Sequence, residues 1–216
     1  MKYDLLNVVQ KRKVTLAGTN IYRIPTIHPD RTLQENDLLF INEGEWSICQ
    51  DDESYRLMAG DMMLLRAYNH HYSLHHCLPN TQTLFVHFSP MPGDQYGVEL
   101  PTQLSSDVVS GDRLQIATVT HCAEHSQPRT VMRDIIETYW SERQDKQRRM
   151  SMLLEVLLNE LAHITYEAQM HKENWISNII RLMYTNHSHM YSLSELAQQA
   201  GMSVRTLSER FRRATG

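Results

Sequence analysis

The sequence predicts an α+β protein in which an antiparallel β-structure is followed by two helices and then by a small all-α unit. Two changes in the pattern of apolar residues predict this order. Residues 13–90 alternate short apolar runs with turn signals, whereas from about residue 129 the apolar residues follow the period of a helix. With 216 residues the chain exceeds the usual domain size of about 100 to 150 residues, so we expect more than one unit.

Short strands account for the N-terminal zone. Its apolar runs are KVTLA, IYRI, DLLFI, WSICQ, YRLM, MLLRA and TLFVHF. Turn signals such as Gly18, Pro25 and the NEGE stretch separate them. Many short strands at near-regular spacing are typical of an antiparallel sandwich or barrel, so we expect one such domain over residues 1–128.

Two helices joined by a charged bend fit residues 129–170. One stripe of the second helix is formed by Leu154, Leu157, Leu158, Leu161 and Ile164. Leu153 and Val156 widen the apolar surface beyond this stripe, so we expect the helix to pack both on its own sheet and on a partner chain. The stripe is too apolar to face water, and we therefore predict a homodimer that uses this segment.

The composition argues against a membrane or secreted protein. The longest apolar run, MLLEVLL, is interrupted by Glu155 and is far shorter than the roughly 18 residues of a membrane span. The three cysteines show no CxxC spacing, and no signal pattern opens the sequence, so we expect free thiols and a cytoplasmic protein. The net charge is −4, yet residues 171–216 hold six Lys/Arg against three Asp/Glu and form the basic end.

Residues 192–216 have the pattern of a helix-turn-helix. Ser192 precedes Glu195 by three positions, which is the spacing of a capping box, and Gly201 supplies the freedom that a sharp turn needs. Ser203 can cap the second helix. The apolar residues predicted to face inward are Leu193, Leu196, Ala197, Ala200, Val204, Leu207 and Phe211.

The outward face of that second helix carries a mixture of polar and charged residues. Its members are Arg205, Ser208, Glu209 and Arg212, with Arg213 beside them. A helix in the major groove of DNA needs such a mixture for base edges and phosphates. An ordinary helical hairpin is the alternative interpretation. We favour DNA binding because the cap, the glycine turn and the basic helix coincide.

The stretch LSELAQQAGMSVRTLSERFRRATG resembles the first helix-turn-helix of the AraC/XylS family of transcription regulators. The preceding ISNIIRLMYTNHSHMYS is similar to the helix that opens the DNA-binding domain of that family. The resemblance implies that Arg205, Ser208 and Glu209 approach base edges, while Arg212 and Arg213 contact phosphates. Because such domains contain two helix-turn-helix units, we expect residues 171–216 to be a partial DNA-binding domain, either of a longer regulator or of a natural short form.

The stretch GDMMLLRAYNHHYSLHHCLPNTQTLFVHFSP is similar to the later half of the cupin-like sensor barrel of these regulators. The resemblance therefore implies a barrel that binds a small-molecule effector, with a sugar as one candidate. Glu43 stands where arabinose-type sensors have an arginine, which weighs against a pentose. The expected effector-binding residues are Tyr72, Thr83, Phe85, Glu43, His71, Arg23 and Trp46, and Arg66 and Tyr22 are further candidates for the same cavity.

The stretch NHHYSLHHC, residues 69–77, is the densest cluster of metal-ligand chemistry in the sequence. Metal-binding cupins also take histidines from an earlier strand pair, and RTLQENDLLFINEGEW contains none. Because side chains alternate along a strand, His71 and His75 face away from His70 and His76. We expect no metal and no cofactor, with a soft-metal site that uses Cys77 as the alternative. We also expect no enzymatic activity, and the competing hypothesis is a metal-dependent cupin enzyme with a helical tail.

Overall fold

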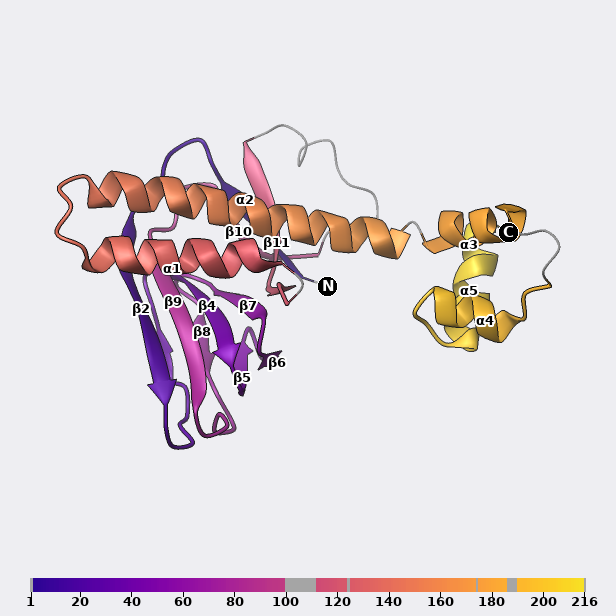
Figure 1. Cartoon of the computed structure of the whole chain (residues 1–216), viewed down its shortest axis with the longest axis horizontal. Coiled ribbons are helices and arrows are strands. Elements are labelled where there is room, and N and C mark those ends of the chain that lie inside the picture. Colours follow the sequence, from indigo (N-terminus) through magenta and orange to yellow (C-terminus); the bar gives the residue numbers. More distant parts are fainter. Residues whose placement is uncertain (1, 100–111, 124, 174, 186–189, 216) are drawn as a thin grey trace. The chain divides into compact units, whose positions relative to one another are not determined.

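The computed structural model describes residues 2–99, 112–123, 125–173, 175–185 and 190–215 (Figure 1). Within these residues the protein is a mixed α+β structure with antiparallel sheets and five helices. It divides into two compact units, Met1–Thr165 and Tyr166–Gly216. Helix α1 (Ser126–Trp140) and helix α2 (Lys146–Glu173) up to Thr165 belong to the same unit as the strands, whereas the sequence predicts a separate segment over 129–170.

The first unit is built on a five-stranded antiparallel sheet in the order β12-β7-β4-β9-β2. These strands are β2 (Val14–Tyr22), β4 (Asn36–Glu43), β7 (Asp61–Leu65), β9 (Thr81–Phe88) and β12 (Val119–His121). A four-stranded sheet in the order β3-β8-β5-β6 faces it and consists of β3 (Arg31–Thr32), β5 (Glu45–Gln50), β6 (Glu53–Met58) and β8 (His70–Tyr72). The apolar runs identified in the sequence overlap β2, β4, β5, β6, β7 and β9.

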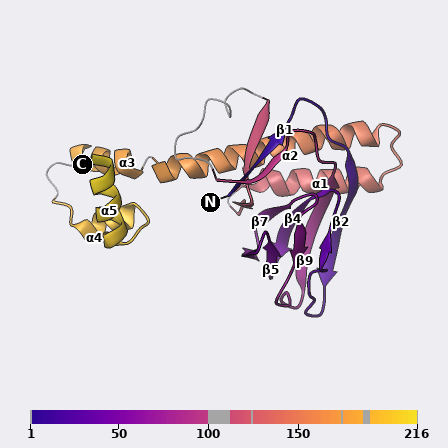
Figure 2. The ribbon, with the colours of Figure 1, turned by 180° about the vertical axis from the view of Figure 1, so that it is seen from behind.

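A third sheet contains three antiparallel strands in the order β10-β1-β11. Its strands are β1 (Tyr3–Asn7), β10 (Gln95–Val98) and β11 (Arg113–Ala117). Leu6 of β1 and Ile116 of β11 join the same buried cluster as the inner residues of α2. Figure 2 shows β1 running beside α2. The N-terminal strand is thus part of the core, although the sequence pattern did not predict it.

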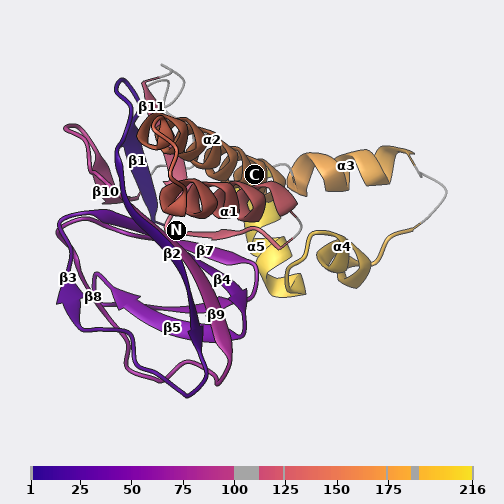
Figure 3. The ribbon, with the colours of Figure 1, turned by 60° about the vertical axis from the view of Figure 1, so that its left-hand side comes forward.

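Side chains alternate between the two faces of the five-stranded sheet because successive residues of a strand point in opposite directions. Leu38 and Phe40 of β4 pack with α1 and α2, whereas Leu39 and Ile41 pack against the four-stranded sheet. Figure 3 shows the two helices on one side of this sheet and β3, β5 and β8 on the other. Both faces of the central sheet are therefore covered within one protomer.

The apolar stripe of α2 fills this core and does not face a partner chain. Leu154, Leu157, Leu158, Leu161 and Ile164 are at most 5% exposed and cluster with the central sheet and α1. Our choice of this stripe as the dimer surface was therefore wrong, because burying it on the protomer's own sheet already removes it from water. A different face of α2 leaves Met152 49% and Val156 43% exposed.

The second unit contains α3 (Trp175–Thr185), α4 (Leu193–Gln199) and α5 (Val204–Thr215). The capping box predicted from the sequence is confirmed: Ser192 Oγ accepts from the Glu195 amide at 3.2 Å, and the Ser192 amide donates to Glu195 Oε2 at 2.7 Å. Gly201 takes a φ of 62° at the turn between α4 and α5. The Thr206 amide donates to Ser203 Oγ at 3.1 Å, which caps the start of α5.

The core of this second unit is small. Ile179, Leu196, Ala197 and Leu207 are buried, with Trp175 and Phe211 partly buried around them. Leu193 and Val204 are 57% and 41% exposed, so our expectation that they face inward was wrong. Each lies in the first turn of its helix, at the edge of the packed surface. No helix in the described part of the chain has the length and apolar character needed to cross a membrane.

Candidate functional site

A cavity of about 180 Å³ lies between the five-stranded and four-stranded sheets. Its lining residues are Leu16, Asn20, Tyr22, His28, Pro29, Arg31, Asp37, Leu39, Trp46, Phe85 and His87. An engineered protein cavity of about 150 Å³ binds benzene, so the space suits a small molecule. Apolar and aromatic walls that carry a few polar groups are typical of small-molecule sites.

The strand register brings the lining residues together. Asp37 pairs with His87 and Leu39 pairs with Phe85 across β4 and β9. Residues directly opposite each other in antiparallel strands point to the same face, so all four side chains point toward the cavity side of the sheet. On β2, Gly18 pairs with Phe85, and a Cβ atom added there would lie 2.8 Å from Phe85 Cζ. The glycine therefore leaves the space that the phenylalanine ring occupies.

Asp37 and His87 form the charged pair of the cavity wall. His87 Nε2 lies 3.2 Å from Asp37 Oδ2, and His87 Nδ1 lies 3.6 Å from Glu35 Oε2. Burial disfavours the charged imidazole, but the hydrogen bond and the charge of Asp37 outweigh burial and raise the pKa of His87. The other carboxylate oxygen of Asp37, Oδ1, is buried without a hydrogen-bond partner among the described residues.

Two further histidines lie beside Arg31 in their neutral form. Arg31 Nε donates to His71 Nε2 at 3.3 Å, which requires that nitrogen to be unprotonated. Burial, followed by the positive charge of Arg31, lowers the pKa of His71. Burial and the neighbouring His71 lower the pKa of His28 to about 4, and its Nδ1 lies 3.0 Å from the Pro29 carbonyl oxygen. The His28 and His71 rings are 5.2 Å apart.

Trp46 provides the aromatic centre of the wall. Its ring lies edge-on to Tyr22 at a centroid distance of 4.7 Å and to His28 at 5.5 Å. The side chain is 2% exposed, and its indole Nε1 has no hydrogen-bond partner within the described residues. A buried tryptophan usually donates a hydrogen bond through its indole N–H, so this group can still donate one to a ligand atom.

The structure brings together some of the residues that we expected at the effector site. Phe85 and Trp46 line the cavity, and His71 contacts Arg31 and His28 in its wall. Thr83 is fully buried on β9, but it borders another cavity of about 320 Å³ that α1 also lines. Arg31, Asp37 and His87 were not among the effector-binding residues expected from the sequence. His87 could have been found, because it lies two positions after Phe85 on β9 and therefore points to the same face of the sheet.

Three expected effector residues do not line the cavity. Tyr72 is half-buried and stacks on His70 with ring centroids 5.0 Å apart. Glu43 is exposed and accepts a hydrogen bond from Gln82 Nε2 at 2.7 Å. Arg23 is exposed in the loop that follows β2. Tyr72 and Glu43 were inferred from a resemblance in sequence, and the strand register directs their side chains elsewhere.

The histidine-rich stretch does not converge on one point. His71 is fully buried, whereas His70 is exposed and lies 2.6 Å from Asp30 Oδ1. His75 and His76 are exposed in the loop before β9, and Cys77 is buried. Over the residues that the structure describes, no group of three or more histidine, cysteine, aspartate and glutamate side chains could hold a metal ion.

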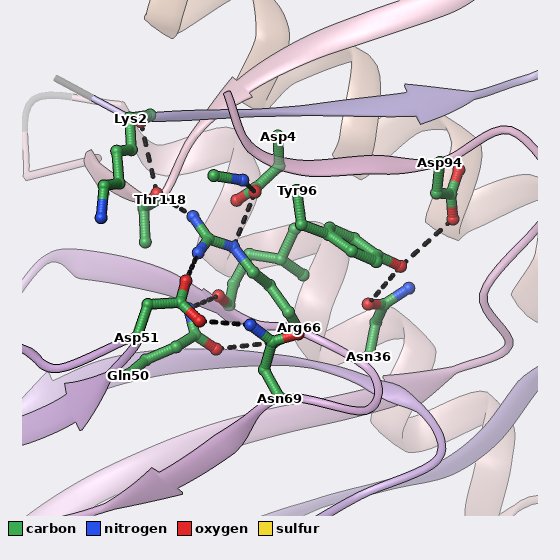
Figure 4. Close-up of polar contacts among 12 residues, drawn as sticks. Lys2, Asp4, Asn36, Gln50, Asp51, Arg66, Asn69, Asp94, Tyr96 and Thr118 are labelled. Atoms are coloured by element: carbon green, nitrogen blue, oxygen red, sulfur yellow. Dashed lines mark hydrogen bonds and ion pairs between the residues drawn. The ribbon is translucent and has the colours of Figure 1, made fainter. Parts of the chain in front are cut away.

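Arg66 lies in a buried polar network and does not line the cavity. Its guanidinium donates through Nε to Asp4 Oδ1 at 2.7 Å, through Nη2 to Thr118 Oγ1 at 2.7 Å and through Nη1 to Asp51 (Figure 4). The side chain is fully buried. Every nitrogen of the group is directed at a protein acceptor, so Arg66 holds β1 against the end of β7 and is not available to a ligand.

The expected DNA-facing residues lie along α5. Arg205 and Glu209 are 89% and 66% exposed, and Arg205 Nε lies 3.0 Å from Glu209 Oε1. Arg212 is exposed as well, while Ser208 is half-buried. The side chain of Arg213 lies outside the described part of the structure. A pair of opposite charges four residues apart on an exposed helix contributes only about 0.3 to 0.5 kcal/mol, so both groups can turn to another partner at small cost.

No family model matches the chain, and no curated protein matches it. Similar solved structures include ToxT from Vibrio cholerae, in which an apo variant is 14% identical with a TM-score of 0.40 over 96% of this chain and 94% of that chain. The wild-type ToxT structure with a bound unsaturated fatty acid is 12% identical, with a TM-score of 0.38 over 96% and 92%. KdgF from Halomonas sp. is 15% identical, with a TM-score of 0.30 over 38% of this chain and 79% of that chain.

Proposed function

We propose that this chain is a ligand-responsive transcription regulator of the AraC/XylS type. The sheet unit binds a small-molecule effector in the cavity between its two sheets, and α4 and α5 form a helix-turn-helix that binds DNA. The observation that carries the proposal is the exposed, charged face of α5, which follows a capped helix and a turn at a glycine with a φ of 62°. A helix-turn-helix places such a second helix in the major groove.

The residues of α5 divide into two roles in this proposal. Arg205, Ser208 and Glu209 approach base edges, where side chains choose the sequence. Arg212 contacts phosphate oxygens together with Arg213 and supplies affinity that does not depend on sequence. Arg205 and Arg212 are exposed, and among the described residues the weak pair with Glu209 is the one ion pair that Arg205 forms, so both side chains can reach DNA.

A homodimer is part of the proposal, and it uses Leu153 and Val156, which flank the apolar stripe in the sequence, and not the buried stripe itself. Met152, Leu153 and Val156 of α2 border a hollow of about 380 Å³, together with Arg148 and Arg149. An apolar patch with a charged rim is typical of protein contact surfaces. We place the protein in the cytoplasm, where its three buried free cysteines suit reducing conditions.

The test is a DNA titration with the 216-residue chain. Duplexes are selected from a random pool, and binding is followed by fluorescence anisotropy at several salt concentrations. The logarithm of the binding constant should fall linearly with the logarithm of salt concentration, and Arg212→Gln should reduce that slope by about one. Arg205→Gln should relax the selected sequence at one or two base pairs.

Arg143→Gln is the matched control for these two variants. Arg143 is an exposed arginine that pairs with an aspartate, Asp145, but it lies in the other unit of the chain. This variant should bind DNA like the wild type. If the wild type binds no DNA, or if Arg205→Gln and Arg212→Gln bind DNA as the wild type does, α5 is not the reading helix and the proposal is wrong.

A further inference from the structure

The cavity wall contains three polar groups with unused hydrogen-bonding capacity. Asp37 Oδ1 is an acceptor and Trp46 Nε1 is a donor, and each is buried without a partner among the described residues. Both side chains are 2% exposed. Arg31 donates through Nε to His71, and its terminal nitrogens have no hydrogen-bond partner in the described structure. Buried polar groups are normally paired, so a ligand is the natural source of the partners that Asp37 and Trp46 lack, while the half-buried Arg31 remains open to a ligand.

The charges of the lining favour an anion with a single charge. Arg31 is positive and Asp37 is negative, and the hydrogen bond to Asp37 favours the positive form of His87. Asp37 shares its charge with His87, so among these lining groups the Arg31 guanidinium is the cation that has no carboxylate partner in the described residues. A dianion such as phosphate would bring a second negative charge next to Asp37, where like charges repel. A neutral polyol would offer the Arg31 guanidinium only hydroxyl oxygens, which are weaker acceptors than a carboxylate.

We propose that this cavity binds a small hydroxycarboxylate, which is a short carbon chain with one carboxylate and at least one hydroxyl group. The carboxylate accepts from the terminal nitrogens of Arg31, whose planar fork matches a carboxylate. The hydroxyl donates to Asp37 Oδ1, and a ligand oxygen accepts from Trp46 Nε1. The inference rests on the proposed function, because it names the chemical class of the effector.

The dimensions and walls of the cavity limit the carbon skeleton. A volume of about 180 Å³ is slightly larger than the roughly 150 Å³ that holds benzene, so the ligand has on the order of six to nine non-hydrogen atoms. Leu39 and Phe85 provide the apolar surface for its carbon atoms. A long-chain fatty acid has about three times as many carbons as benzene and exceeds this volume.

The test compares three probes with the same four-carbon chain. Isothermal titration of the full chain is carried out with 3-hydroxybutyrate, with butyrate, which lacks the hydroxyl, and with butane-1,3-diol, which lacks the carboxylate. 3-Hydroxybutyrate should bind at least tenfold more tightly than either of the other two. Equal binding of the diol and the hydroxy acid, or of butyrate and the hydroxy acid, would overturn the proposal.

Two variants assign the contacts. Arg31→Gln should remove the advantage of 3-hydroxybutyrate over the diol, and Asp37→Asn should reduce its advantage over butyrate, because the amide offers a weaker acceptor than the carboxylate. Arg23→Gln, an exposed arginine that does not line the cavity, is the control and should change neither ratio. Thermal unfolding of each variant shows whether it is folded. If folded Arg31→Gln protein keeps the wild-type ratios, the assignment of the carboxylate to Arg31 is wrong.

The DNA titration described above separates the failure of this inference from the failure of the proposed function. If the chain binds DNA through Arg205 and Arg212 but binds none of the three probes, the proposed function stands and the hydroxycarboxylate proposal is wrong. If the chain binds 3-hydroxybutyrate with the predicted preferences but binds no DNA, the proposed ligand class stands and the proposed role as a transcription regulator is wrong.

Discussion

Arg66 Nε donates a hydrogen bond to Asp4 Oδ1 at 2.7 Å, and neither side chain has any exposed surface. This pair joins β1, close to the start of the chain, to the end of β7, 62 residues away in sequence (Figure 4). Burial raises the pKa of Asp4 even though the charge of Arg66 opposes the shift. The carboxylate therefore depends on the guanidinium to remain charged inside the protein.

Removing Arg66 should destabilise the first unit strongly. Arg66→Met leaves Asp4 without its buried partner, and breaking such a pair costs about 3 to 5 kcal/mol of unfolding free energy. Urea unfolding followed by circular dichroism measures the loss. Arg56→Met is the control, because Arg56 forms an exposed pair with Glu45 and should cost less than about 1 kcal/mol. Equal losses of unfolding free energy in the two variants would show that the buried pair stabilises the protein no more than the exposed pair does.

His28 should make the unfolding free energy depend on pH below neutrality. The pKa of this histidine falls from 6.5 to about 4, because burial and the neighbouring His71 disfavour its charged form. As the pH falls from 6.5 toward 4, the unfolded chain binds a proton at this position and the folded chain does not. His28 therefore leaves the free energy of unfolding unchanged above pH 6.5. As the pH falls from 6.5 to 4, its effect lowers that free energy by about 3 kcal/mol.

The measurement is the free energy of unfolding at pH 7 and at pH 4.5 for the wild type and for His28→Gln. The drop in stability between these two pH values should be smaller in the variant, because glutamine binds no proton. The other groups that face His28, namely His71, Arg31 and Asp37, are the same in both proteins. His75→Gln, in an exposed loop, is the control and should keep the wild-type drop. A variant with the full wild-type drop would exclude His28 as the source.

Two neighbouring residues of α2 should have opposite effects. Leu157 is fully buried in the core, whereas Val156 is 43% exposed. Leu157→Glu places a charge in the core and should abolish folding of the first unit. Val156→Glu should leave the unfolding temperature within a few degrees of the wild type and convert the predicted dimer to a monomer in light scattering. A dimeric Val156→Glu protein would show that this face of α2 is not the interface.

Local patterns in the sequence were enough to predict most of the regular elements. The capping box of Ser192 and Glu195 depends only on residues three positions apart, and the helical period of α2 depends only on spacing along one helix. Strand β1 was missed because its sequence, YDLLN, contains a charged residue that is buried only when Arg66 reaches it. Nothing close to Asp4 in sequence indicates that partner.

The cavity depends on pairings that are distant in sequence. Asp37 meets His87 across 50 positions and Arg31 meets His71 across 40, through the register of β4 with β9 and of β3 with β8. The resemblance to sensor barrels indicated Phe85, and Trp46 was a candidate because ligand pockets combine apolar walls with a few polar groups. The sequence could not identify Asp37, because the register of two strands is decided by the packing of the whole sheet.

Gly201 should be needed for the turn between α4 and α5, and the reason is its backbone conformation. Its φ of 62° lies in the left-handed region, and a Cβ atom at this position would meet no heavy atom within 4 Å. Gly201→Ala therefore introduces backbone strain and no steric clash, and it should cost the second unit about 1 to 2 kcal/mol. Gly201→Asn should cost less, because asparagine tolerates this region better than alanine. Hydrogen exchange of the α4 and α5 amides measures the effect in this unit alone, and protection should follow the order glycine, asparagine, alanine. Equal protection in all three proteins would mean that the turn does not require a left-handed residue, and the helix-turn-helix geometry would then have to arise from the packing of Leu196 and Leu207 alone.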